Sequence, residues 1–513
     1  MRTLLISLFA LSLLAIPSSA QVVAPPACNL ENNINVCTFE GIDASQIQGV
    51  GPNVDPNGAV GKTQYMEWTN PVYQAYSKTS PYAPVWPSGP MDGSTPWRYH
   101  IPDCVGASGN VVVNYDKLAS RWVIGRRQAN NEGNGNELYY YCIAISSADD
   151  LSTATWYPYG FDLSSVLGTN SEGHYYYPDY PRISTWPDAY YVTIDVEDPD
   201  DGFIEVGVIA CAFDRTNMLK NNTMRAPICF SYPKTFSDNL FYAHSLLPAD
   251  ADGTVAPPAG MPEAFASLEN PTSGTTSNTL NMWEFHVNWN NPSLSTFTGP
   301  ISFPVNPYTQ GCYTPDLPTN TVCVPEPSTP QTNNFIDSVG DRLMQRLTFR
   351  SFGGAQPYWS YVFSTTVQVG TGIESQTGVQ WYEFRATPKY TRLAHSGIIN
   401  PGDSNFRFMP SAAQDKVGNL AVGYSASGYS MHPAIDASYL NLRSSSQTPT
   451  EISLFPGTAD EENTFHWGVY TSMTVDPSDD CTFWYVNEYY TETQLTNPTW
   501  QTRISNFKLP NCK

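Results

Sequence analysis

Positive charge is scarce in this chain. Lys and Arg number 25 against 47 Asp and Glu, which gives a formal net charge of -22 at pH 7. Binding to nucleic acid depends on Lys and Arg that neutralise phosphates, and an anionic membrane surface attracts the same residues. The composition therefore excludes nucleic acid as an expected partner, and a polyanionic ligand would need a local basic patch.

Long apolar segments are missing beyond the first residues. The apolar run Leu4–Ile16 follows Arg2 and precedes the small residues Ser18–Ala20. It is shorter than the roughly 20 apolar residues that a membrane helix needs. This pattern is typical of a secretory signal peptide. We expect residues 1–20 to be removed and the mature protein to be secreted (extracellular or periplasmic), monomeric and without a membrane span.

Several catalytic motifs are absent. The sequence has no GxSxG elbow, no HExxH helix motif and no glycine-rich loop of the phosphate-binding kind. Serine esterase, zinc protease and nucleotide-dependent activities are therefore not expected. There is no CxxC motif and no cysteine–histidine cluster, so the cysteines indicate neither a metal nor a redox site.

All ten cysteines follow the predicted cleavage site, and an even number suits an exported, disulfide-bonded protein. We predict structural disulfides, although spacing alone leaves their connectivity open. The two pairs closest in sequence come first, and three others complete the set: Cys28/Cys37, Cys312/Cys323, Cys104/Cys142, Cys211/Cys229 and Cys481/Cys512.

Aromatic residues are plentiful, at 13% with 32 tyrosines, and short β-branched and aromatic runs bounded by Gly, Pro, Asn and Asp recur throughout. These features predict an all-β protein. One recurring unit, two strands around an Asp-containing turn, is found at 111–125, 181–195, 411–425 and 471–490. A second unit, an apolar strand that leads into a polar turn, recurs near residues 74, 142, 210, 284, 382, 439 and 505.

Seven copies of similar length predict a β-propeller of seven four-stranded blades, stapled by disulfides. A six- or eight-bladed ring and two packed β-sandwiches are the alternatives. We expect a leader at 21–50 and a propeller at 51–513 with an insert at about 303–335. We also expect the strand Gln64–Ser77 to close the ring by pairing with the C-terminal segment.

The Asp-containing turns resemble the Asp-box turns of sialidase-like propellers, S/T-x-D-x-G-x-x-W/F. The turn AAQDKVGNL has one extra residue before its glycine, and TVDPSDDCTFW has no glycine. The stretches DPNGAVG, YPDYPRIS and DPSDDCTFWYVNEYY also resemble a group of secreted bacterial β-propeller proteins with sialidase-like architecture and no settled activity. The resemblance implies the fold and export more than a particular chemistry.

The first candidate site is the stretch GHYYYPDYPRIS, residues 173–184. Its tyrosines, among them Tyr177 and Tyr180, offer flat faces with hydroxyl tips that suit a sugar ring. Asp179 could accept sugar hydroxyls or act in catalysis, and Arg182 could bind a carboxylate in bidentate fashion. Packing between blades is the alternative role.

A second candidate is DRLMQRLTFR, with Arg342, Arg346 and Arg350 on one face if it forms a strand. The cluster resembles part of the arginine triad that sialidases use, and implies substrate binding by Arg342 and Arg346. An ion-paired blade face is the alternative.

The third candidate combines FHWGVY with NEYY. His466 and Trp467 could bind substrate, and Glu488 could act with Tyr490, since the sialidase exception pairs a glutamate with a tyrosine nucleophile. Aromatic packing in the last blade is the alternative. His244 is a candidate general base, as in propeller-shaped polysaccharide lyases, or only a hydrogen-bonding loop residue.

Calcium is the only cofactor the sequence suggests. DPNG, with Asp55 and Asn57, and DADG, with Asp250 and Asp252, offer paired oxygen ligands before a turn glycine. Neither continues into a full calcium-binding loop.

The leading functional hypothesis is a secreted, sialidase-like glycoside hydrolase acting on extracellular glycans or polysaccharides. A non-catalytic propeller that binds glycans or proteins at the cell surface, and a His/Tyr polysaccharide lyase, are the alternatives. Fold alone does not separate them, because propellers carry many unrelated functions.

Overall fold

The computed structural model describes residues 26–513 except 48–53, 107–108, 132–136, 234–239, 242, 272–276, 314–320, 355, 371–374, 462–465 and 492–498. The predicted signal peptide lies outside the described residues. Within them, no helix is long and apolar enough to cross a membrane.

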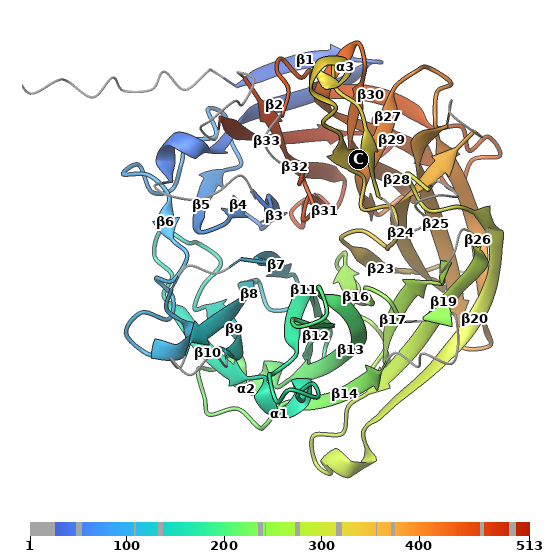
Figure 1. The fold of residues 1–513 in the computed structure, drawn as a ribbon. Helices are drawn as coiled ribbons and strands as arrows, with labels where there is room; N and C mark the ends of the chain where they lie inside the picture. The colour runs from blue at the N-terminus through green and yellow to red at the C-terminus, as the bar shows by residue number, and fades with distance from the viewer. Residues whose placement is uncertain are drawn as a thin grey trace, which may run out of the picture.

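The chain is an all-β propeller in which antiparallel sheets surround a central axis (Figure 1). The first three sheets are β3–β6, β7–β10 and β11–β14. Their strands are Asn57–Val60, Gln64–Thr69, Val72–Ser77, Met91–Asp92; Val112–Asp116, Arg121–Asn131, Glu137–Ser146, Trp156–Asp162; and Tyr177–Thr185, Tyr190–Asp198, Ile204–Phe213, Ile228–Pro233.

The fourth and fifth units are β16, β17, β19, β20 and β23–β26. A parallel pairing of β16 with β23 joins them into one eight-stranded sheet. Their strands are Leu247–Asp252, Glu263–Leu268, Ser277–His286, Thr296–Tyr308; and Leu347–Phe352, Tyr358–Val369, Gln376–Thr387, Tyr390–Ile399.

The sixth unit is β27–β30, and the seventh is a five-stranded sheet in the order β1-β2-β33-β32-β31. Their strands are Phe406–Gln414, Asn419–Gly428, Met431–Asn441, Thr450–Phe455; and Ala27–Glu31, Ile34–Asp43, Trp500–Lys508, Thr482–Tyr490, Ser472–Val475. The described strands thus form seven radial units, and the predicted propeller is confirmed.

Short elements connect the units. The helices are α1 (Ser164–Leu167), α2 (Arg215–Met218) and α3 (Thr329–Thr332), and the single-turn 3-10 helices are η1 (Ala44–Gln46), η2 (Pro102–Cys104) and η3 (Pro292–Leu294). Two small two-stranded sheets pair β15 (Leu240–Phe241) with β18 (Asn270–Pro271) and β21 (Val322–Val324) with β22 (Ile336–Asp337). The insert predicted at about 303–335 starts later than residue 303, because β20 continues to Tyr308.

The seven predicted apolar strands each fall on the third strand of a unit: β5, β9, β13, β19, β25, β29 and β33. The four predicted Asp turns each join a unit's first and second strands. At Asp415, for example, the side-chain Oδ1 accepts hydrogen bonds from the backbone N–H groups of Val417 and Asn419, both at 2.9 Å. The carboxylate fixes the turn as its residue type predicts.

Ring closure differs from the prediction. Gln64–Ser77 forms β4 and β5 inside the first unit. The closing strand is β2, which pairs with β33 from Val36–Phe507 onward. Part of the predicted leader thus belongs to the propeller. The sequence argument failed because β2 contains no Asp turn and was not recognised as a strand of the repeat.

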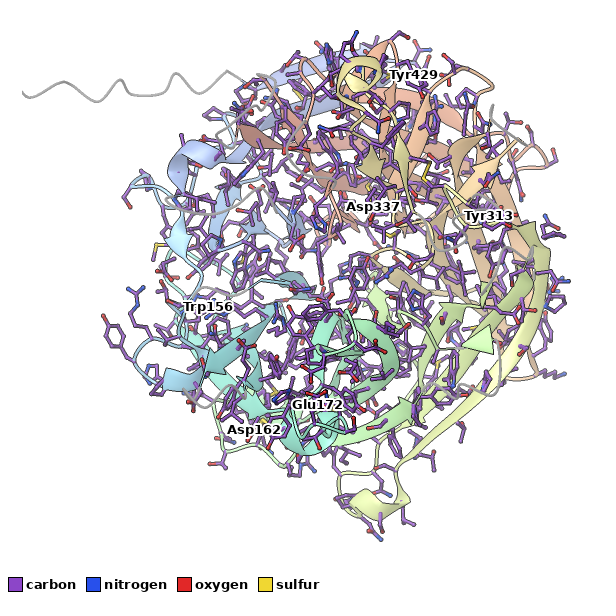
Figure 2. All side chains as sticks on the ribbon, in the orientation of Figure 1. Trp156, Asp162, Glu172, Tyr313, Asp337 and Tyr429 are labelled. Carbon is purple, nitrogen blue, oxygen red and sulfur yellow. A yellow bond between two sulfur atoms is a disulfide. The ribbon has the colours of Figure 1, made fainter. Side chains whose placement is uncertain are left out.

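Side chains fill the space between neighbouring sheets (Figure 2). Strands inside the ring are covered on both faces, so β28 is buried at every position. Its glycines allow close packing, since a Cβ added at Gly423 would lie 2.6 Å from the ring of Tyr485. The structure also contains five disulfides, and their pairs are those predicted: Cys28–Cys37, Cys104–Cys142, Cys211–Cys229, Cys312–Cys323 and Cys481–Cys512.

Candidate active site

Segments that are far apart in sequence meet where the innermost strands begin. These strands, β3, β7, β11, β16, β23, β27 and β31, surround the axis (Figure 1). Asn110 precedes β7, His244 precedes β16, Arg342 precedes β23 and Tyr470 precedes β31. Because strands alternate in direction, the end of each second strand and the start of each third strand lie at this same end of the ring.

Five carboxyl groups gather there, and we call them the acidic cluster: Asp179, Asp195, Glu197, Glu205 and Asp341. Asp179 on β11 lies opposite Asp195 on β12, and Glu197 on β12 lies opposite Glu205 on β13. Residues directly opposite on antiparallel strands have Cβ atoms about 4.5–5.5 Å apart, and diagonal neighbours are about 7–8 Å apart. Asp195 is buried, whereas the other four are only partly buried.

This crowding makes two of the carboxyl groups hold their protons. Burial, reinforced by the charge of Glu205, raises the pKa of Asp195 to about 7. Burial together with Asp179 and Asp195 raises the pKa of Glu197 to about 8. A carboxylic acid that stays protonated near neutral pH can donate a proton to a reacting group.

Asp341 has the opposite environment. Its burial alone would raise its pKa, but Arg342 and His244 outweigh that effect and hold the pKa well below the ordinary value. Arg342 donates to Asp341 from Nε at 2.8 Å and from Nη2 at 3.0 Å. His244 lies between the carboxyl groups of Glu205 and Asp341, which raise its pKa to about 10 although burial opposes this.

Aromatic rings hold the arginines in place. The guanidinium carbon of Arg182 lies 3.5 Å from the ring centroid of Tyr180 and 4.1 Å from that of Tyr470. The guanidinium carbon of Arg342 lies 4.7 Å from the Tyr180 centroid. Such cation–π contacts each contribute about 0.5–2 kcal/mol, more when desolvated.

A β-bulge in β11 makes this arrangement possible. The register shifts between Asp179 and Arg182, and Tyr180 has φ 52°. Strand β27 repeats the feature, with a shift between Phe408 and Ser411 and φ 51° at Met409. In both strands a proline follows the residue with positive φ. Bulges redirect side chains and are common beside active sites.

The site therefore brings together several of the predicted residues. Asp179 accepts a hydrogen bond from Asn110 at 2.6 Å, and the same amide donates to the Tyr470 hydroxyl at 3.0 Å. Tyr177 is half-buried, with the guanidinium of Arg127 over its ring. Arg182 is only 1% exposed, and its Nε and Nη2 have no hydrogen-bond partner among the described residues.

The predicted arginine group does not stay together. Arg346 immediately precedes β23 and Arg350 lies within it. Both belong to what we call the paired cluster: Arg346, Arg350, Asp250, Asp252 and Asp480. Arg346 donates through Nη2 to Asp250 and Asp252, and Arg350 donates through Nη1 to Asp480 at 2.8 Å. The ion-paired blade face, which is the alternative role predicted for this segment, fits these two residues.

The proposed calcium ligands already have protein partners. The carboxylates of Asp250 and Asp252 lie against Arg346, and Lys117 also contacts Asp252. Asn57 donates to the Tyr470 carbonyl and accepts from the Val113 N–H. These residues do not fit calcium, because cations and backbone groups occupy their oxygens.

Asp55 accepts a hydrogen bond from Asn70, and burial raises its pKa. Among the described residues, one group of three has a geometry that could hold a metal ion: Glu172, His174 and Asp200. It lies near the surface, and His174 there bonds to Asp200.

The third predicted group is mostly buried. Glu488 is 1% exposed, burial raises its pKa well above the ordinary value, and its Oε1 has no partner among the described residues. Tyr490 is fully buried and packs on Trp467, with ring centroids 5.1 Å apart. Only His466 is exposed. The aromatic-packing alternative therefore fits Trp467 and Tyr490.

Sequence reasoning missed Asn110, Asp195, Glu197, Glu205 and Asp341. The sequence does carry one signal for two of them. Asp195 and Glu197 are two residues apart on the strand that follows the first candidate stretch, so their side chains point to the same face of that strand. Glu205 and Asn110 carry no local signal, since only the ring brings them to the site.

No protein-family model matches the chain, and no curated protein does. Solved structures do match. An ulvan lyase bound to a GlcA(1-4)Rha3S segment is 10% identical, with a TM-score of 0.40, covering 88% of this chain and 93% of its own. An α-L-arabinanase of Penicillium chrysogenum is 12% identical, with a TM-score of 0.37 and coverage of 80% and 95%.

The β-propeller domain of Nup133 from Vanderwaltozyma polyspora is 9% identical, with a TM-score of 0.41 and coverage of 94% and 100%. Two carbohydrate-active enzymes and a nucleoporin domain thus score alike. Function has to be argued from the site itself.

Proposed function

We propose that the protein is a secreted glycoside hydrolase that uses the acidic cluster. The observation that carries the proposal is the meeting of Asp179, Asp195 and Glu197 on adjacent strands, next to Arg342, at the end of the ring where Asp179 and Glu197 are partly solvent-exposed. Glycoside hydrolysis needs a protonated acid and an ionised carboxylate on either side of the scissile bond.

Glu197 is the proposed general acid, because its raised pKa keeps it protonated near neutral pH and its side chain is partly exposed. Asp179 is the proposed general base, which activates a water. Diagonal positions on paired antiparallel strands are about 7–8 Å apart. This backbone spacing is compatible with the carboxyl separation of about 6.5–9.5 Å that leaves room for a glycosidic oxygen and a water in an inverting mechanism. Asp195 helps to hold the proton on Glu197.

Arg342 is the proposed substrate-contacting arginine, because 20% of its side chain is exposed. Arg182 supports the two tyrosines instead, since it is almost fully buried. Glu488, a residue considered for acid–base work, is too buried for the role. The sialidase-type arginine triad is not part of the proposal, because Arg346 and Arg350 bind aspartates.

The lyase alternative needs a neutral His244 as base. Its pKa of about 10 favours the protonated form, and its two nitrogens lie against Glu205 and Asp341. We therefore assign His244 a positioning role.

Five disulfides support export, since they form in oxidising compartments. If the signal peptide is removed as expected, N-terminal sequencing of the secreted protein will find its first residue near Gln21.

The test is incubation of the purified protein with a panel of plant, algal and animal polysaccharides. New reducing ends without ultraviolet absorbance from unsaturated uronates are the expected result. Absorbance from unsaturated uronates would favour the lyase instead, and the absence of both signals on every substrate would favour the non-catalytic binding protein.

A further inference from the structure

A second feature lies at the seam where the ring closes. A cavity of about 650 Å³ separates the seventh unit from the first, bounded by β2, β33, β5 and residues 81–89. Its volume is within the range of about 300–1,000 Å³ that small-molecule sites occupy. Tyr489 lies at the end of β32, Thr491 follows that strand, and Gln501 lies at the start of β33, so the cavity reaches the same end of the ring as the acidic cluster.

Aromatic side chains form its walls, and they hold one another in place. Phe39 stacks on Tyr82 with centroids 4.5 Å apart and an interplanar angle of 4°. Phe455 packs on Tyr489 at 4.6 Å. Trp86 lies over the edge of this wall, half-buried, and its backbone carbonyl accepts a hydrogen bond from Gln74. Such rigid rings offer an apolar face at a low cost in conformational entropy.

Polar groups lie between the rings. The Tyr489 hydroxyl lies 2.7 Å from a carboxylate oxygen of Glu40 and 2.7 Å from the amide oxygen of Gln501, so its single proton is donated to one of these two acceptors. Gln46 and Asp43 add an amide and a carboxylate. Amide and carboxylate groups arranged beside aromatic faces match a ligand with hydroxyl groups on a ring that has apolar C–H faces.

The charge of the cavity limits the ligand further. Glu40 and Asp43 are the charged residues among the described lining. Arg503 forms an ion pair with Glu40, and its guanidinium carbon lies 4.4 Å from the ring centroid of Phe455, so Asp43 carries the unbalanced negative charge. An anionic sugar would be repelled by Asp43, and Arg503 is already paired with Glu40. An uncharged sugar has no such penalty.

We propose that this seam cavity binds a short segment of a neutral polysaccharide. The inference deepens the proposed function, since a chain held at the seam would lie on the same end of the ring as the acidic cluster. Binding there requires no catalysis, so the two proposals fail separately.

The experiment is electrophoresis of the full protein in native gels that contain neutral polysaccharides (arabinan, xylan, galactomannan) or anionic ones (polygalacturonate, alginate). Three variants accompany it. Trp86→Ala removes the half-exposed ring, Thr491→Trp fills the mouth of the cavity, and Tyr390→Ala removes a 51% exposed ring on β26 as the matched control. Circular dichroism melting confirms that each variant folds.

We expect at least one neutral polysaccharide to retard the protein and its Tyr390→Ala variant, with retardation reduced at least tenfold in Trp86→Ala and in Thr491→Trp. Retardation by anionic polysaccharides alone, equal retardation of all variants, or none at all would overturn the seam site. Hydrolysis measured in the panel above would still stand in those cases. Conversely, seam binding without hydrolysis would overturn the proposed function alone.

Discussion

Two charged clusters lie on different strands, and their balance of charge differs. The acidic cluster lies on β11, β12 and β13 and in the segment before β23, whereas the paired cluster lies on β16, at β23 and in the turn between β31 and β32. In the paired cluster the carboxylates of Asp250, Asp252 and Asp480 each contact an arginine at 2.8 Å or closer. In the acidic cluster five carboxyl groups share Arg342, His244 and the stacked Arg182. The paired cluster meets the ordinary requirement for burying charge, whereas the acidic cluster keeps protons instead. The difference indicates that the first stabilises the ring and the second is available for chemistry.

The largest effect is expected from removing the proposed acid. Glu197→Gln should lower the hydrolysis rate by about 10²–10⁴-fold, because general acid catalysis contributes that much. Its melting temperature should stay close to that of the unmodified protein. The measurement is reducing-end release on the best substrate, with Glu284→Gln as a control on an exposed glutamate of β19. Equal rates for the two variants would remove Glu197 from the mechanism.

The paired cluster should respond in stability instead. Arg346→Met leaves Asp250 and Asp252 buried without their arginine, which is expected to cost about 3–5 kcal/mol of unfolding free energy. Urea unfolding measures it, with Arg392→Met on β26 as the control. Adding Asp250→Asn should recover part of the loss. A neutral effect of Arg346→Met would show that the two clusters do not differ in this way.

The pH dependence of stability should also separate the clusters. Asp195 and Glu197 have folded-state pKa values of about 7 and 8, raised from unfolded values of about 4. Raised carboxyl pKa values favour folding below about pH 4, and this contribution is lost as pH rises to about 8. Urea midpoints at pH 5 and pH 8 measure the loss, which should be smaller in Glu197→Gln than in the Glu284→Gln control. An equal change in urea midpoint between pH 5 and pH 8 in the two variants would contradict this contribution of Glu197.

Calcium should have the smallest effect. Because Arg346 binds the carboxylates of Asp250 and Asp252, we expect calcium chloride or a chelator at 1 mM-scale concentration to shift the melting temperature by less than about 1 °C. A larger rise with calcium would show a site that the paired cluster does not explain, and Glu172→Gln would then test whether the surface group is responsible.

The sequence predicted the architecture better than the site. Local signals such as the Asp turn at Asp415 and the strand near residue 142 repeat in each unit, and each is confirmed because a turn or a strand depends on its own residues. The first candidate stretch likewise led to Asp179 and Arg182. Glu205 and Asp341, in contrast, belong to different units, and only the folded ring brings both of them against His244. Ring closure was mispredicted for the same reason, since Val36 and Phe507 are distant in sequence.

The pairing of β2 with β33 has a consequence for how the protein forms. Strand β2 can pair with β1 as soon as both have been made, but its other edge has no partner until β33 has been synthesised, so the ring cannot be completed before then. Until then the growing chain exposes a free strand edge, which invites association with other chains. The Cys28–Cys37 bond joins β1 to β2, so its formation early in synthesis would keep this hairpin paired until β33 is available.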